Sequence, residues 1–148
     1  MNLKRVLTAS QIFPWIEAPD KDAAIREMVR LLAATRGVTE IAPLLEAVLA
    51  REAKESTALE HGIAVPHGKT DAVNDLFAGI GRVPEGVDFG ARDGEPTRIL
   101  VMTVSPLART GPHLQFLGEV MRLLRDPTLR QGILDAPDAT TILRLVLA

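Results

Sequence analysis

The chain has 148 residues, of which 47% are hydrophobic, 24% charged and 3% aromatic, and these values suit one globular domain over residues 1–148. The formal net charge of -2, with no Lys/Arg cluster longer than a pair, argues against a nucleic-acid partner. The absence of Cys excludes disulfides, thiolate zinc sites and thiol nucleophiles. No apolar stretch is long enough for a membrane span, and no signal segment is visible. We therefore expect a cytoplasmic protein with no direct membrane insertion.

Two amphipathic helices are predicted in the first third of the chain. Asp20 is a suitable N-cap for the first helix, which is expected over about 21–35 with apolar residues at i, i+3, i+4 and i+7. Thr39 can cap the second helix, which repeats this spacing and is expected to end at Arg51 or one residue later. Each helix should bury one face.

The middle of the chain predicts strands. The run 63–65 is typical of a short buried strand that ends at Pro66, because proline cannot donate to a strand ladder. A second strand is predicted over 76–82, followed by the turn-rich stretch 84–93. The continuous aliphatic run 98–104 predicts a central strand that is buried on both faces.

Three further helices are predicted after the strands. Thr110 or Gly111 can cap the first, and Pro112 suits its first position. Its expected buried stripe consists of Leu114, Leu117, Met121 and Leu124. Asp126 and Asp138 begin the other two helices, and the inward positions of the last are Ile142, Leu145 and Val146. The expected fold class is α/β, with a mixed sheet of about five strands flanked by helices on both faces in a single domain.

His67 is the strongest candidate for chemistry. It follows Pro66 directly, so its backbone is stiff, and it is placed just past the predicted strand end and beside Gly68. Ligands of α/β folds are met at strand ends, where a neutral imidazole can act as nucleophile, base or metal ligand. The alternative is an ordinary loop residue.

His113 is a second candidate, in the first turn of a predicted helix. The helix dipole there favours an anion and disfavours an imidazolium, so this side chain should be neutral and still donate one N–H. The alternative is a side chain that only faces water.

Weaker candidates lie upstream of His67. The guanidinium of Arg51 could bind phosphoryl oxygens in a two-point fork, although its position at a helix end favours a surface role. Ser56 and Thr57 supply hydroxyls that could also serve a turn or a cap. Lys69 is close to His67 and is a further candidate, but it could equally be a charge that only faces solvent. His61 is expected to be a surface or turn residue.

These residues resemble a known motif. Arg51-Glu52, Ser56-Thr57 and the run from Gly62 to Lys69 resemble the phosphorylation motif of enzyme IIA domains of the bacterial phosphoenolpyruvate-dependent phosphotransferase system. The resemblance is to the fructose, mannitol and nitrogen-regulatory class (type 2), and it covers nearly the whole chain. One departure is that Ala58 and Glu60 occupy a stretch that is often Gly-rich in the family. We expect this departure to alter local backbone freedom more than chemistry.

The resemblance implies a phosphohistidine carrier that needs neither a cofactor nor a metal. His67 would accept the phosphoryl group from the phosphohistidine of the carrier HPr and pass it to a cysteine of an enzyme IIB for sugar uptake. His113 would position the phosphoryl group or the ring, Arg51 would stabilise charge, and Thr57 would bond the ring or the phosphoryl group. An apolar docking patch with a polar rim is then expected around His67. The resemblance also implies the alternative of a nitrogen-regulatory protein whose phosphorylation state controls partner binding.

Two other classes fit the sequence less well. A metal-dependent hydrolase could use His61, His67 and His113, but their spacing matches no ligand pattern. A Ser-His nucleophile could use Ser56 or Ser105, but no Gly-x-Ser-x-Gly elbow is present. The lack of a Gly-rich nucleotide loop fits a phosphoryl donor other than ATP.

Overall fold

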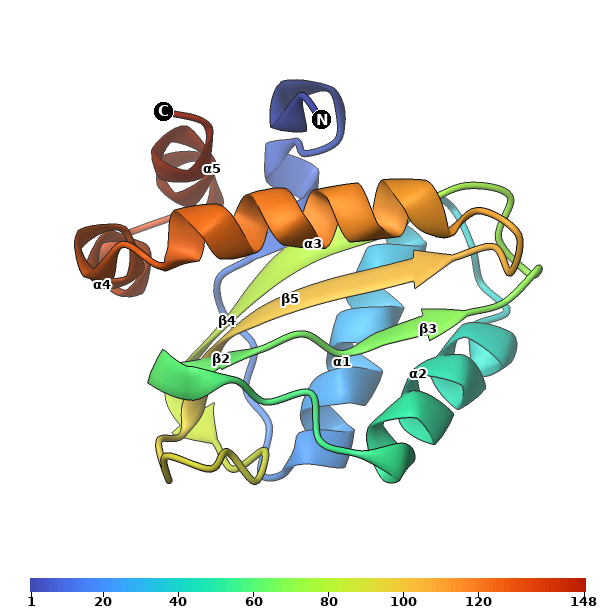
Figure 1. Cartoon of the computed structure of the whole chain (residues 1–148), viewed down its shortest axis with the longest axis horizontal. Helices are drawn as coiled ribbons and strands as arrows, with labels where there is room; N and C mark the ends of the chain where they lie inside the picture. Colours follow the sequence, from blue (N-terminus) through green and yellow to red (C-terminus); the bar gives the residue numbers. More distant parts are fainter.

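A five-stranded mixed sheet forms the centre of the structure, a computed structural model that describes residues 1–148 (Figure 1). β4 (Phe77–Val87) and β5 (Thr97–Ser105) pair antiparallel in its middle. β1 (Ile12–Phe13) runs parallel to β4 at one edge. β2 (Ile63–Ala64) and β3 (His67–Lys69) follow each other along the other edge, both parallel to β5. The predicted α/β class with a mixed sheet is therefore confirmed.

Helices cover both faces of this sheet (Figure 1). α1 (Lys21–Ala34) and α2 (Ala42–Lys54) pack on one face. The other face carries α3 (Thr110–Leu124), α4 (Pro127–Asp135) and α5 (Ala139–Leu147). Three short 3-10 helices complete the chain: η1 (Leu3–Arg5), η2 (Ala9–Gln11) and η3 (Glu60–Gly62). None of the helices combines the length and the apolar character needed to cross a membrane.

The alternation of side chains along β5 separates two cores. Leu100, Met102 and Val104 join the core under α1 and α2. Ile99 and Val101 join the core under α3, α4 and α5. Because successive strand residues point to opposite faces, Thr103 continues the second row and faces α3. This row leads to the candidate functional site.

Three of the predicted helix starts are confirmed. Asp20 accepts a hydrogen bond from the backbone N–H of Ala23, and Asp126 and Asp138 cap α4 and α5 in the same way. The predicted cap of the second helix is wrong. α2 begins at Ala42, with Pro43 in its first turn, and it continues to Lys54. Proline in the first turn costs no hydrogen bond, so the helix starts there and not at Thr39.

The strand boundaries differ from prediction at two places. β4 continues through part of the expected turn region to Val87, with a register shift between Arg82 and Val87. Pro66 only interrupts the edge strand, and pairing with β5 resumes at His67. His67 therefore lies within β3 and not beyond a strand end, because an edge strand tolerates a missing donor.

Three of the four predicted inward positions of α3 are displaced by one residue, and the fourth, Leu124, is buried as predicted. The buried residues of α3 are His113, Phe116, Val120 and Leu124. Leu114 is 64% exposed, and Leu117 and Met121 are only half-buried. The sequence pattern failed here because a polar residue, His113, occupies an inward position. The helix also begins at Thr110, two residues before the predicted first position at Pro112, with Arg109 as its N-cap residue.

Candidate functional site

Two histidines face each other on the α3 side of the sheet. The ring centroids of His67 and His113 are 5.0 Å apart, and the ring planes are inclined by 37°. The parallel register places His67 beside Thr103 of β5, and paired residues of neighbouring strands share a face. His113 comes down on the same place from the first turn of α3. The two histidines predicted from the sequence are thus brought together.

The backbone of Val65 fixes the tautomer of His67. The Nδ1 atom of His67 lies 2.9 Å from the carbonyl oxygen of Val65. A carbonyl only accepts, so Nδ1 carries the hydrogen and donates it. The Nε2 atom of the neutral ring then has a free lone pair. Half-buried and oriented in this way, His67 can act as a nucleophile through Nε2.

The loop before β2 holds this carbonyl in place. The N–H of Val65 donates to the carbonyl of Thr57 at 3.1 Å, and the N–H of Leu59 donates to Ile63 at 2.7 Å. The segment 57–59 therefore folds back along β2 and fixes the peptide that orients His67.

Gly68 allows α2 to approach the strand directly behind His67. A Cβ at this position would lie 2.8 Å from the carbonyl carbon of Ala47 and 2.8 Å from the nitrogen of Val48. Backbone atoms cannot move aside as a flexible side chain can, so only glycine fits. α2 thus packs directly against the face of β3 that is opposite the His67 side chain, and this contact fixes the position of the strand.

His113 is buried and neutral. It is 5% exposed, and its Nδ1 atom lies 2.6 Å from the hydroxyl oxygen of Thr103. Burial lowers the pKa of His113 to about 4, with smaller contributions from the charges of His67 and Lys69. The ring therefore carries one N–H at neutral pH, as its place at a helix N-terminus also favours.

A pocket of about 620 Å³ opens beside His67 and brings two arginines to it. Arg51 lines the pocket from α2, and its Nη1 atom donates to the carbonyl of Glu55 at 2.8 Å. Arg92 lines it from the connection between β4 and β5. Arg92 was missed from the sequence, because nothing in the local pattern shows that this connection returns to the end of α2. One contact that anchors this connection is a hydrogen bond from the hydroxyl of Ser56 to the carbonyl of Phe89, at 2.7 Å.

Thr57 also lines the pocket, but its donors are directed elsewhere. Its hydroxyl donates to Oε1 of Glu52 at 2.5 Å, and its backbone N–H donates to Oε2 at 2.6 Å. The ammonium group of Lys21 lies 3.6 Å from the same carboxylate. The predicted bond from Thr57 to the ring or to a phosphoryl group therefore stays a prediction. Because both donors of Thr57 are used by Glu52, its hydroxyl could take part in such a bond only as an acceptor.

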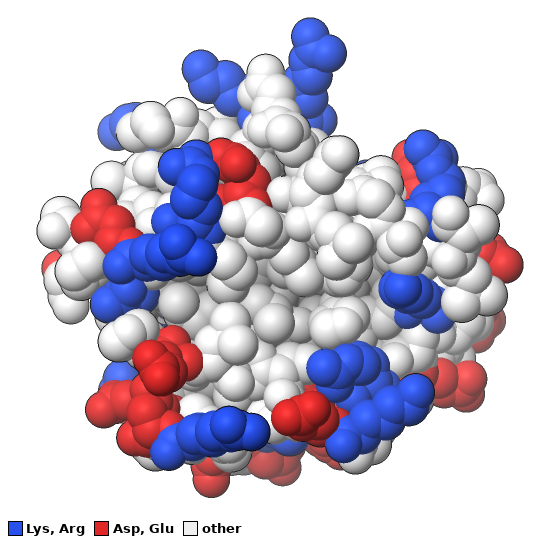
Figure 2. All heavy atoms as spheres, viewed as in Figure 1, with Lys and Arg blue, Asp and Glu red and all other residues white.

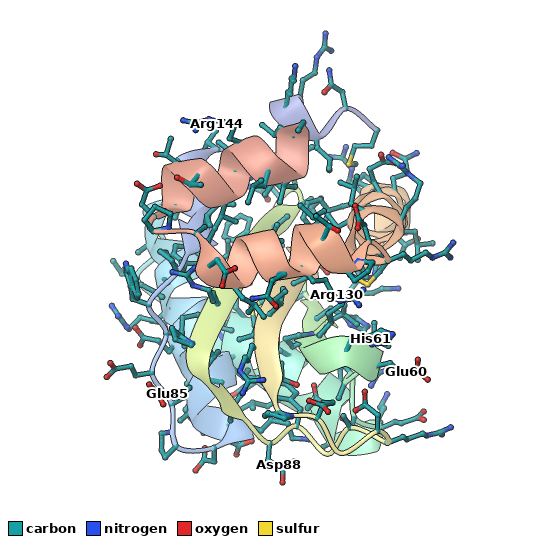
Figure 3. The ribbon with its side chains drawn as sticks, turned by 90° about the vertical axis from the view of Figure 1, so that its left-hand side faces the viewer. Glu60, His61, Glu85, Asp88, Arg130 and Arg144 are labelled. Atoms are coloured by element: carbon teal, nitrogen blue, oxygen red, sulfur yellow. The ribbon has the colours of Figure 1, made fainter.

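The third histidine lies apart from this pair. His61 adopts φ +67° in an exposed turn, and its backbone N–H donates to the carboxylate of Asp93. With Arg130 it lines a different pocket, of about 450 Å³, between η3 and α4 (Figure 3). His61 is thus a turn residue, as expected. Lys69 is exposed on β3.

This fold and this histidine pair define an α/β domain of the phosphotransferase-system type. The family model "Phosphoenolpyruvate-dependent sugar phosphotransferase system, EIIA 2" matches residues 5–148. The chain belongs to this family, and EIIA domains are phosphotransferase components of that system.

Three relatives show the range of the family. A fructose-specific EIIA component of Haloferax volcanii is 34% identical over 82% of this chain and 79% of its own length. A nitrogen regulatory protein of Bradyrhizobium diazoefficiens is 29% identical over 96% of this chain and 92% of its own. A fructose-specific EIIABC component of Bacillus subtilis is 31% identical over 99% of this chain, which spans only 23% of that longer protein.

Two solved structures of IIA proteins are similar to this chain over nearly its whole length. The nitrogen regulatory protein IIA-Ntr of Neisseria meningitidis is similar with a TM-score of 0.87 and 26% identity, over 97% of this chain and 98% of its own. Enzyme IIA for mannitol of Escherichia coli, in complex with phosphorylated enzyme IIB for mannitol, is similar with a TM-score of 0.80 and 28% identity. That similarity covers 95% of this chain and 96% of the other.

Proposed function

We propose that this protein is a phosphohistidine carrier that accepts a phosphoryl group on Nε2 of His67. The observation that carries the proposal is the hydrogen bond from Nδ1 of His67 to the carbonyl of Val65. It leaves the lone pair on Nε2, on a ring that lines the pocket with two guanidinium groups. Membership of the EIIA 2 family supports the same role.

The donor is the phosphohistidine of an HPr-like carrier. The lone pair on Nε2 of His67 forms the new N–P bond as the N–P bond of the donor breaks, and the electron pair of that bond returns to the nitrogen of the donor imidazole. Nδ1 of His67 keeps its hydrogen and donates it to the Val65 carbonyl throughout, so no proton has to move. Such a transfer needs alignment and charge stabilisation more than covalent help from the protein.

The positive groups around His67 meet the charge of the phosphoryl oxygens. Arg51 and Arg92 line the pocket, and a guanidinium can bind two phosphoryl oxygens at once. His113 supplies one N–H, and the N-terminus of α3 adds its dipole. A bound phosphoryl group is thereby held without a metal ion.

The surface around the histidine pair suits transient docking. Figure 2, seen from the side on which α3 and β3 lie in front, shows a central area without charged side chains inside a rim of both signs. Leu59, Leu107 and Leu114 are 42%, 60% and 64% exposed. An apolar centre with a polar rim is typical of interfaces that form and dissociate. HPr would dock here first and the acceptor afterwards.

We propose an enzyme IIB cysteine as the acceptor, for sugar uptake. The fructose-specific relative, at 34% identity, and the solved complex of the mannitol IIA with its phosphorylated IIB support this acceptor. The second candidate is a nitrogen-regulatory role, in which phosphorylation of His67 controls partner binding. The TM-score of 0.87 with IIA-Ntr favours it. Both roles use the same site.

Intact-mass measurement tests the proposal. The protein is incubated with phosphoenolpyruvate, enzyme I and HPr, beside the His67→Ala and His61→Ala variants. We expect one acid-labile phosphoryl group on the wild type and on His61→Ala, and none on His67→Ala. No mass gain with an HPr that is competent toward another EIIA would overturn the carrier function. Adding a fructose-type enzyme IIB then separates the two roles, because a sugar carrier loses the phosphoryl group to it and a regulator retains it.

A further inference from the structure

The side chain of Thr103 has one hydrogen-bond partner, and that partner is a histidine. Its side chain is fully buried (0% exposed) in the central strand β5. The only polar atom in hydrogen-bond contact with its hydroxyl is Nδ1 of His113, at 2.6 Å. The same residue stands beside His67 in the register between β3 and β5. Thr103 thus contacts the ring of His113 and is the neighbour of His67 on the adjacent strand.

Burial decides which atom of this pair is the donor. A hydroxyl carries one hydrogen, and a buried hydrogen without an acceptor costs the desolvation of the group. If Nδ1 of His113 donated to Thr103, the hydroxyl hydrogen would have no acceptor. If Thr103 donates, the hydroxyl hydrogen is satisfied and Nδ1 is the acceptor. The hydroxyl therefore donates, and the hydrogen of the neutral ring resides on Nε2.

We propose that Thr103 is a positioning residue that fixes His113 as the Nε2–H tautomer, so that this N–H donates to the phosphoryl group on His67. The inference rests on the proposed carrier function for its consequence, but the tautomer itself is a property of the unphosphorylated protein. The two facing rings then hold opposite tautomers. His67 has its hydrogen on Nδ1 and a lone pair on Nε2, and His113 has the reverse arrangement.

The neutral state of His113 makes this assignment matter. A charged imidazolium would donate from both nitrogens and would need no partner to choose between them. A neutral ring buried beside His67 has one hydrogen only, and in the wrong tautomer its Nε2 lone pair would repel a phosphoryl oxygen. A single hydroxyl on the strand below therefore determines whether His113 attracts or repels the transferred group.

The matched variants are Thr103→Val, which removes the donor at nearly the same volume, and Thr103→Ser, which retains it. Thr97→Val is the control on the same strand, because Thr97 is 0% exposed and its hydroxyl has no hydrogen-bond partner. Long-range ¹H–¹⁵N spectra of the imidazole rings report the tautomer of each histidine directly at neutral pH.

We expect the wild type, Thr103→Ser and Thr97→Val to show hydrogen on Nε2 of His113. Thr103→Val should show hydrogen on Nδ1 in part or in full, with an upward shift of the pKa of His113, because the neutral form has lost a hydrogen bond. Phosphorylation of His67 by HPr should slow by about fivefold to tenfold in Thr103→Val, the ratio that one net hydrogen bond represents. It should be unchanged in Thr97→Val.

The outcomes separate the two proposals. Hydrogen on Nδ1 of His113 in the wild type, or unchanged spectra in Thr103→Val, would overturn the positioning role even if His67 is phosphorylated normally. An unphosphorylated wild type with hydrogen on Nε2 would leave the tautomer assignment standing and remove the carrier function. If Thr103→Val does not fold, the wild-type and Thr103→Ser spectra still decide the assignment.

Discussion

The hydroxyl of Thr57 donates to the buried carboxylate of Glu52 at 2.5 Å, and this contact lies at the start of a short path to His67. The carbonyl of Thr57 accepts from the N–H of Val65, and the carbonyl of Val65 accepts from Nδ1 of His67. Glu52 is on α2, so the helix and the histidine are joined through two peptide groups. The tautomer of His67 is therefore tied to a carboxylate that never touches its ring.

The first prediction concerns this carboxylate. Glu52→Gln should lower the free energy of unfolding by about 1–3 kcal/mol, because an amide offers one acceptor oxygen to the two donors of Thr57 and leaves the other unsatisfied. Urea denaturation measures the change. Glu55→Gln is the control, since Glu55 is exposed at the end of the same helix. Equal stability of Glu52→Gln and the wild type would show that this contact contributes nothing to the fold.

The second prediction concerns the two arginines of the pocket. Arg51→Ala and Arg92→Ala should each slow phosphorylation by HPr about 10-fold to 100-fold, because each removes a charged donor to the phosphoryl oxygens. Arg92→Lys should fall between, since lysine keeps the charge and loses the two-point fork. Rates follow from the mass gain with time.

Arg98→Ala is the matched control for these variants, because Arg98 lines the pocket beside His61 instead. A rate for Arg92→Ala equal to that of Arg98→Ala would remove Arg92 from the site and leave Arg51 as its guanidinium.

The sequence could predict the site where local chemistry marked it, and it failed where tertiary contacts decide. The Pro66-His67-Gly68 run and the first-turn position of His113 are local features, and both histidines were found. Arg92 lies in a turn-rich stretch, and this stretch is anchored near the pocket by tertiary contacts such as the hydrogen bond from Ser56 to Phe89. A single sequence contains no signal for such a contact.

The inward face of α3 shows the same limit for the fold. Apolar periodicity assumes that polar side chains face outward. His113 points inward, where its ring bonds to Thr103, so the first three predicted positions of the stripe were one residue too late, and Leu114 is exposed. Leu114 directly follows His113, and an exposed apolar side chain there suits the proposed docking surface better than a core.

The third prediction concerns the close approach of α2 to β3. Gly68→Ala should destabilise the protein by about 1–3 kcal/mol, because its Cβ would overlap the backbone of α2. Phosphorylation should slow as well, since β3 must move and carries His67 with it. Gly118→Ala is the control: a Cβ there meets nothing within 4 Å, and we expect about 0.5–1 kcal/mol of stabilisation of the helix. Stability of Gly68→Ala at or above that of the wild type would show that α2 can shift without cost.

The last prediction concerns pH and follows from the buried, neutral His113. Its pKa is about 4 in the folded protein, against the ordinary value of 6.5 for a histidine in the unfolded chain. As the pH falls below about 6.5 the unfolded chain binds a proton that the folded protein refuses, so the free energy of unfolding decreases until the pH reaches about 4 and this group contributes no further change. The loss amounts to at most about 3 kcal/mol.

The His113→Gln variant isolates this contribution. Carboxylates that also titrate in the range are common to both proteins and cancel in the difference between them. Urea denaturation at several pH values should therefore give a stability difference, wild type minus His113→Gln, that is largest above pH 6.5 and shrinks steadily toward pH 4. Parallel curves for the two proteins would mean that His113 accepts a proton in the folded state as readily as in the unfolded one. The neutral ring on which its role as a single N–H donor depends would then be lost.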